Sequence, residues 1–134
     1  MPTGVDVLGF TNEWYKRGFQ HKWRISLDTL TSIDLLETPY FVATKLVATF
    51  NRGMADLRTS KDFEDIVYIL RNRSIALQEI LATEGDIRTF LRDSFQYLLN
   101  LEIIDEAITT VLEFGESPGT KNLIRSSMVR IAAV

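Results

Sequence analysis

The stretch Pro39–Leu70, PYFVATKLVATFNRGMADLRTSKDFEDIVYIL, decides the fold because its apolar residues recur at helical spacing on both sides of one short break. A proline suits the first turn of a helix, so the first helix is expected to begin at Pro39. It is expected to end near Asn51-Arg52-Gly53, and the second to begin at Thr59 or Ser60. The expected core stripes are Tyr40, Ala43, Val47 and Phe50, with Val42 and Leu46 beside them, then Phe63, Ile66, Val67 and Leu70.

Helical spacing continues to the end of the chain. Ser74 is a candidate cap for a third helix with the sequence IALQEILAT, and residues 86–100 predict a fourth. Residues 101–114 predict a fifth helix, and a break at Gly115–Gly119 precedes a last one over 121–134. The stripes expected for the fourth and last helices are Ile87, Leu91, Phe95 and Leu98, and Leu123, Ile124, Met128 and Ile131.

Upstream of Pro39 the pattern changes. WRISL and SIDLL, residues 23–27 and 32–36, alternate apolar and polar residues as half-buried strands do, and LDTLT between them is a candidate hairpin connection. The predicted fold class is therefore α+β, a short N-terminal antiparallel β remnant followed by a mainly helical bundle. The chain is expected to form a single domain over residues 1–134. Residues 1–38 form its β-containing part and residues 39–134 its helical part.

Composition excludes several classes of site. The chain has 134 residues, 46% of them hydrophobic and 25% charged, which is typical of a soluble globular domain. It has no cysteine and one histidine, His21, so disulfides, thiolate sites and multi-histidine metal sites are excluded. A net charge of −3 argues against an electrostatic nucleic-acid binder. Neither a membrane span nor a signal peptide is recognisable, so we expect a cytoplasmic protein with no membrane partner.

Lys45 is the only charged residue between Pro39 and Asn51, and no carboxylate lies three or four residues from it. A lysine on an apolar helix without a local partner either extends its ammonium group to water or meets a partner from elsewhere in the fold. Two interpretations therefore stay open. Lys45 is a surface lysine, or it faces a cleft and binds phosphate as a point charge.

Asp62 and Asp65 are one helical turn apart and share a helix face. As structural residues, Asp62 would complete a capping box with Thr59, and Asp65 would pair with Lys61, a contact of about 0.2–0.5 kcal/mol. As functional residues, the two acids would hold a cation or orient Lys45. No third ligand is apparent in the sequence, so no metal site is assigned.

The only basic cluster is KRGFQHKWR, residues 16–24, which aromatic residues interrupt. Cations alternating with aromatic rings are what single-stranded RNA or a nucleotide base contacts, whereas the structural interpretation is an exposed segment whose rings pack inward. The candidate nucleic-acid-binding residues are Lys16, Arg17, Lys22 and Arg24.

Three blocks, LGFTNEWY, PYFVATKLVATFNRG and SKDFEDIVYIL, together resemble bacterial nucleotidyltransferase-like proteins of the AbiEii abortive-infection toxin type, which have a DNA-polymerase-β-like catalytic fold. The resemblance runs from Met1 to about Leu70, and more loosely to about Leu101. It implies a toxin–antitoxin setting, with Mg²⁺ and a nucleoside triphosphate as cofactor and substrate. It also implies catalytic roles for Lys45, Asp62 and Asp65, in which Lys45 neutralises triphosphate charge and Asp62 orients Lys45 or assists at the metal edge.

The chain departs from that family in one respect: it contains no D-x-D pair, which holds the magnesium ions in the family. It is similar to the C-terminal part of such proteins, so we expect a truncated nucleotidyltransferase that is inactive alone. The candidate partners are a nucleotide, an RNA, a second copy of the chain, a missing N-terminal half and an antitoxin. The alternative is a non-catalytic helical protein-interaction module.

Overall fold

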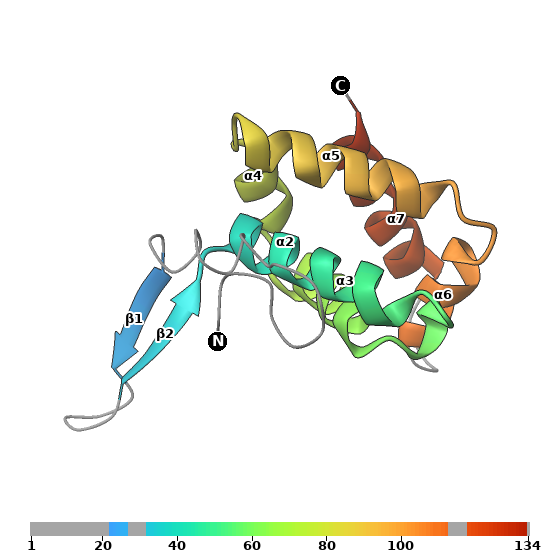
Figure 1. Ribbon diagram of the computed structural model, residues 1–134, viewed down its shortest axis with the longest axis horizontal. Helices are drawn as coiled ribbons and strands as arrows, with labels where there is room; N and C mark the ends of the chain where they lie inside the picture. Colours follow the sequence, from blue (N-terminus) through green and yellow to red (C-terminus); the bar gives the residue numbers. More distant parts are fainter. Residues whose placement is uncertain (1–21, 27–31, 113–117, 134) are drawn as a thin grey trace.

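The computed structural model describes residues 22–26, 32–112 and 118–133 (Figure 1). Helices and helical turns make up most of residues 37–112 and 118–133. The α-helices there are α2 (Thr38–Ala48), α3 (Lys61–Asn72), α4 (Ala76–Leu81), α5 (Asp86–Leu99), α6 (Ile104–Val111) and α7 (Pro118–Ala132). Between α2 and α3 lie a π-helical turn, η1 (Thr49–Gly53), and a short 3₁₀ turn, η2 (Leu57–Thr59).

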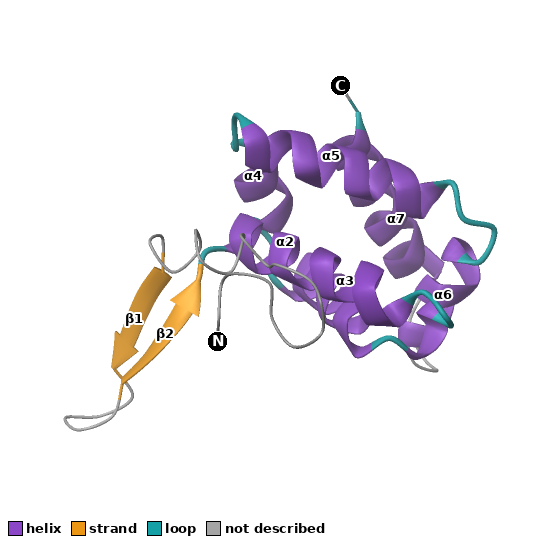
Figure 2. Ribbon diagram, in the orientation of Figure 1, coloured by secondary structure: helices purple, strands orange, loops and turns teal. Residues whose placement is uncertain are grey.

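The two strands form an antiparallel hairpin beside the helical body (Figure 2). Strands β1 (Lys22–Ser26) and β2 (Ser32–Leu36) pair with Trp23 opposite Leu35, and together they make a two-stranded sheet with no further strand among the described residues. The described hydrophobic core lies wholly in helices and helical turns. The predicted α+β fold class is wrong, because the described body of the protein, residues 37–112 and 118–133, is all-helical. Alternation of apolar and polar residues indicates strands, but it does not show whether their sheet joins the core. The predicted LDTLT connection lies outside the described residues.

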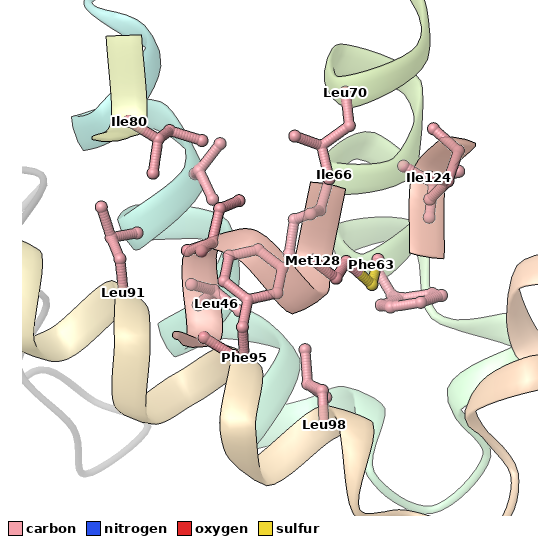
Figure 3. Packing of buried hydrophobic residues seen from close by; sticks show 14 of the residues in the cluster. Leu46, Phe63, Ile66, Leu70, Ile80, Leu91, Phe95, Leu98, Ile124 and Met128 are labelled. Carbon is pink, nitrogen blue, oxygen red and sulfur yellow. The ribbon is translucent and has the colours of Figure 1, made fainter. Parts of the chain in front are cut away.

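The core forms where α2, α3, α4, α5, α6 and α7 meet, and Figure 3 shows part of it. The close-up shows Met128 of α7 beside Phe63 of α3, while Phe95 of α5 lies near Leu46 of α2. The large side chains that are fully buried are Phe63, Phe95, Leu46, Leu57, Ile66, Ile80, Leu91, Leu98, Ile108, Ile124, Met128 and Ile131. Each helix therefore contributes an apolar stripe to one continuous core.

Two of the expected stripes are partly wrong. In α2 the fully buried residues are Val42, Ala43 and Leu46, whereas Tyr40 and Val47 are only half-buried. Because α2 is apolar almost all round, periodicity alone does not select which side faces the core. In α7, Leu123 is 59% exposed although Ile124, Met128 and Ile131 are buried as predicted. The stripe expected for α5 is confirmed throughout.

The helix ends follow local capping chemistry, although two predicted caps are wrong. Pro39 lies in the first turn of α2, as predicted. The cap of α3 is Ser60, whose hydroxyl accepts a hydrogen bond from the backbone N–H of Phe63 at 3.1 Å. Thr59 instead donates to the carbonyl oxygen of Asp56, so the predicted capping box with Asp62 does not form. Helix α4 begins after Ile75 without a side-chain cap, which replaces the predicted cap by Ser74.

Candidate functional site

Helices α2 and α3 lie side by side, and this packing brings together the three residues that the sequence singled out as catalytic. Lys45 lies in the third turn of α2, whereas Asp62 and Asp65 lie in the first two turns of α3. The apolar residues next to them hold the two helices together, because Leu46, Phe63 and Ile66 are fully buried. The shared core therefore sets how Lys45 faces the two acids.

Lys45 is paired with both acids. Its Nζ atom lies 2.8 Å from Oδ2 of Asp65 and 3.5 Å from Oδ1 of Asp62. The same nitrogen lies 5.7 Å from the centre of the Phe41 ring, within the range of a cation–π contact. The Lys45 side chain is 26% exposed. The sequence left open whether Lys45 meets a partner from elsewhere in the fold. The structure shows two such partners, Asp62 and Asp65.

Arg52 joins this cluster, although the sequence assigned it only to the end of a helix. Its Nε donates to Oδ2 of Asp62 at 3.0 Å, and its Nη2 donates to Oδ1 at 3.3 Å. This fork-shaped contact is the geometry that guanidinium and carboxylate groups favour. Arg52 lies in η1, and a π-helical turn holds more residues than an α-helical turn, which changes the direction of the side chains that follow it. The sequence therefore showed Arg52 only as a cation at the end of a helix, and it did not show that Asp62 is its partner.

Asp62 is the centre of the cluster, since Lys45 and Arg52 both contact its Oδ1. Its side chain is only 9% exposed. Burial raises the pKa of Asp62, but hydrogen bonding from Arg52 and the charges of Arg52 and Lys45 outweigh that effect. The pKa of Asp62 therefore lies below its usual value, and the carboxylate is ionised at neutral pH. The pKa of Arg52 is raised by the same hydrogen bond.

The two positive and two negative charges of the cluster balance, so either a phosphate or a metal ion would have to displace an existing ion pair. Its two acids are already engaged by cations, and no group of three or more carboxylate, histidine or cysteine side chains is placed to hold a metal within the described ranges. The Mg²⁺ that the resemblance implies therefore has no such group of ligands among the described residues and stays a prediction. A phosphate would instead compete with Asp65 for the ammonium group of Lys45, because Asp65 is the more exposed of the two acids.

The predicted nucleic-acid-binding residues are not brought into this cluster by any described contact. Lys22 and Arg24 lie in β1, where they pair in register with Leu36 and Asp34. Lys16 and Arg17 lie outside the described residues. Their role in RNA binding stays a prediction.

No family model, curated protein or solved structure matches this chain. The resemblance to AbiEii-type nucleotidyltransferases therefore stays a prediction from the three sequence blocks. In residues 22–26, 32–112 and 118–133, no helix combines the length and the apolar character that crossing a membrane requires.

Proposed function

We propose that this chain is the nucleotide-binding helical part of a nucleotidyltransferase-like protein, acting in the bacterial cytoplasm in a toxin–antitoxin setting. Lys45 and Arg52 bind the phosphates of a nucleoside triphosphate, and Asp62 holds both cations in position. The chain binds the nucleotide but does not transfer it alone, because its sequence has no D-x-D pair to hold the magnesium ions.

One observation carries the proposal. Residues of two separate sequence blocks, PYFVATKLVATFNRG and SKDFEDIVYIL, meet in one cluster, where Lys45 lies 2.8 Å from Asp65 and 3.5 Å from Asp62. The resemblance implies that these three residues share one site. Lys45 comes from the first block and the two acids from the second, so neither block forms the site alone. Their contact supports a common role, since an acid that orients a lysine must lie within reach of it.

The chemistry assigns a distinct task to each residue. Lys45 supplies a point charge and Arg52 a planar fork, and both are groups that proteins use to bind phosphate. Asp62, buried and ionised, keeps the two cations from repelling each other before the ligand arrives. Asp65 is displaced from Lys45 when a phosphate oxygen takes its place.

The test measures binding of ATP, CTP, GTP and UTP to the whole chain by calorimetry, with and without Mg²⁺. We expect at least one triphosphate to bind and the matching nucleoside to bind far more weakly. Lys45→Met should weaken that binding about tenfold or more, because it removes the charge and keeps the apolar stem.

Lys61→Met is the matched control. Lys61 is 86% exposed, and among the described residues its ion pair is a 3.6 Å contact with Glu64 of its own helix. Its replacement removes the same charge from α3 and should change binding less than about twofold. Equal losses in the two variants would indicate unspecific attraction, and no binding of any triphosphate would contradict the proposal.

A second candidate, a non-catalytic helical interaction module, is favoured by the charge balance of the cluster. Lys45 and Arg52 carry two positive charges that Asp62 and Asp65 already balance, as in an ion-pair network that only joins helices. In that case Lys45→Met lowers stability, no nucleotide binds, and a protein partner co-purifies with the chain.

A further inference from the structure

A second feature, independent of the Lys45 cluster, is an open groove of about 380 Å³ between the η1 segment and α5. Phe50, near the start of η1, and Met54, directly after it, line one side, and residues of α5 line the other side. Ligand pockets for small molecules commonly span about 300–1,000 Å³, so the groove has room for a small organic ligand. The described residues that line it are Phe50, Met54, Phe90, Asp93, Ser94 and Tyr97.

Aromatic rings form two walls of this groove at right angles. The ring centres of Phe50 and Tyr97 lie 5.7 Å apart, and the ring planes meet at 87°. Tyr97 is 55% exposed, so a ligand that covered its ring would remove apolar surface from water. Phe90 and the thioether of Met54 complete an apolar and polarisable lining.

The one charged residue among the six described lining residues is an acid, Asp93. Its Oδ1 accepts a hydrogen bond from Arg92 Nε at 3.1 Å in an ion pair, and its side chain is 58% exposed. Aromatic faces carry negative potential, so rings and carboxylate together attract cations and disfavour anions. Rings at right angles beside a carboxylate are the kind of lining that recognises quaternary ammonium groups.

We propose that this groove binds a small quaternary ammonium compound, with its methyl groups against Phe50 and Tyr97 and its charge toward Asp93. This function is separate from the proposed nucleotide site, since the groove is lined by an acid where that site depends on two cations. Binding of one ligand therefore does not require binding of the other.

The test compares choline with 3,3-dimethyl-1-butanol, its uncharged counterpart of nearly the same shape. The readout is NMR of protein labelled at the methionine methyl groups, where Met54 lines the groove and Met128 is fully buried in the core. We expect choline to shift the Met54 signal saturably and to leave Met128 unchanged. The alcohol should bind about fivefold more weakly or worse, because it lacks the cation–π attraction.

Tyr97→Leu and Tyr68→Leu provide a matched pair of variants. Both tyrosines are exposed on helix surfaces, at 55% and 62%, but only Tyr97 lines the groove. Tyr97→Leu should weaken choline binding about fivefold without changing the binding of the alcohol, and Tyr68→Leu should change neither. Equal affinity for choline and the alcohol would overturn the proposal and leave a merely apolar groove. Absence of any saturable Met54 shift would overturn it as well.

Discussion

At the scale of single residues, the fold depends on the close approach of Gly53 to Ser60. A Cβ atom built on Gly53 would lie 2.5 Å from Oγ and 2.9 Å from Cβ of Ser60, closer than such atoms approach in proteins. Ser60 is the cap of α3, so it has little freedom to move away. The last position of η1 therefore requires glycine, because a larger side chain would clash with Ser60.

We predict that Gly53→Ala lowers the free energy of unfolding by about 1–3 kcal/mol, because the added methyl group forces Ser60 out of its capping position. Urea unfolding followed by circular dichroism measures the change. In the background Ser60→Gly, which removes the opposing side chain, the same substitution should cost much less. An equal cost in both backgrounds would show that the contact with Ser60 is not the cause.

At the scale of elements, two polar centres join helices that the apolar core brings together. Asp62 connects α3 to both α2 and η1 through Lys45 and Arg52. At the other end of these helices, Glu79 of α4 accepts hydrogen bonds from Thr38 of α2 and Arg73 at the end of α3. Because single ion pairs contribute little at the surface, the partial burial of both acids gives these contacts their value.

We predict that Asp62→Asn destabilises the protein by about 1–2 kcal/mol at pH 7, and that the difference from the parent chain narrows in acid. The pKa of Asp62 is lower in the folded than in the unfolded state. Its contribution is therefore complete above about pH 4 and is lost as the pH falls through the folded-state pKa.

The measurement is urea unfolding of both proteins between pH 7 and pH 3. The hydrogen bond with Arg73 also lowers the pKa of Glu79. Protonation of Glu79 in acid therefore lowers the free energy of unfolding of both proteins equally. The comparison therefore isolates Asp62. A difference that stays constant across this pH range would mean that the loss in Asp62→Asn does not come from its charge.

At the scale of the whole molecule, the described core is helical and continuous. Every residue of it lies between Val42 and Ala132, and α7, the last helix, packs against both α3 and α5. The C-terminal helix therefore closes the bundle by contacting elements far from it in sequence. The fold is set by the stretch from α2 to α7, with the hairpin beside it (Figure 2).

We predict that a chain of residues 37–134 folds without the preceding segment, because the described core loses none of its members. Thermal unfolding followed by circular dichroism should give one cooperative transition, with a midpoint within a few degrees of that of the whole chain. Loss of cooperativity would show that residues 1–36 supply part of the core. Deletion of residues 118–134 is the opposite control, and it should abolish the transition because it removes Ile124, Met128 and Ile131.

The sequence by itself determined where the helices lie, because helix periodicity and capping are local. The stripe of α5 was predicted correctly since only one side of that helix is apolar. The buried side of α2 was not, since most of its residues are apolar, and only packing against α3 and α5 selects Val42, Ala43 and Leu46. The spacing around Lys45 also showed that any partner had to come from outside its helix.

Only the tertiary structure decided which residues are the partners of Lys45. Lys45 and Asp65 are twenty positions apart, and whether they meet depends on the path of the chain through η1 and η2. Arg52 reaches Asp62 for the same reason, through a π-helical turn that no local pattern predicted. The fold class was decided at this level too: alternation predicts β1 and β2, but only the tertiary structure shows one helical core across residues 37–112 and 118–133. Local patterns depend on nearest neighbours along the chain, whereas contacts between elements depend on how the whole core packs.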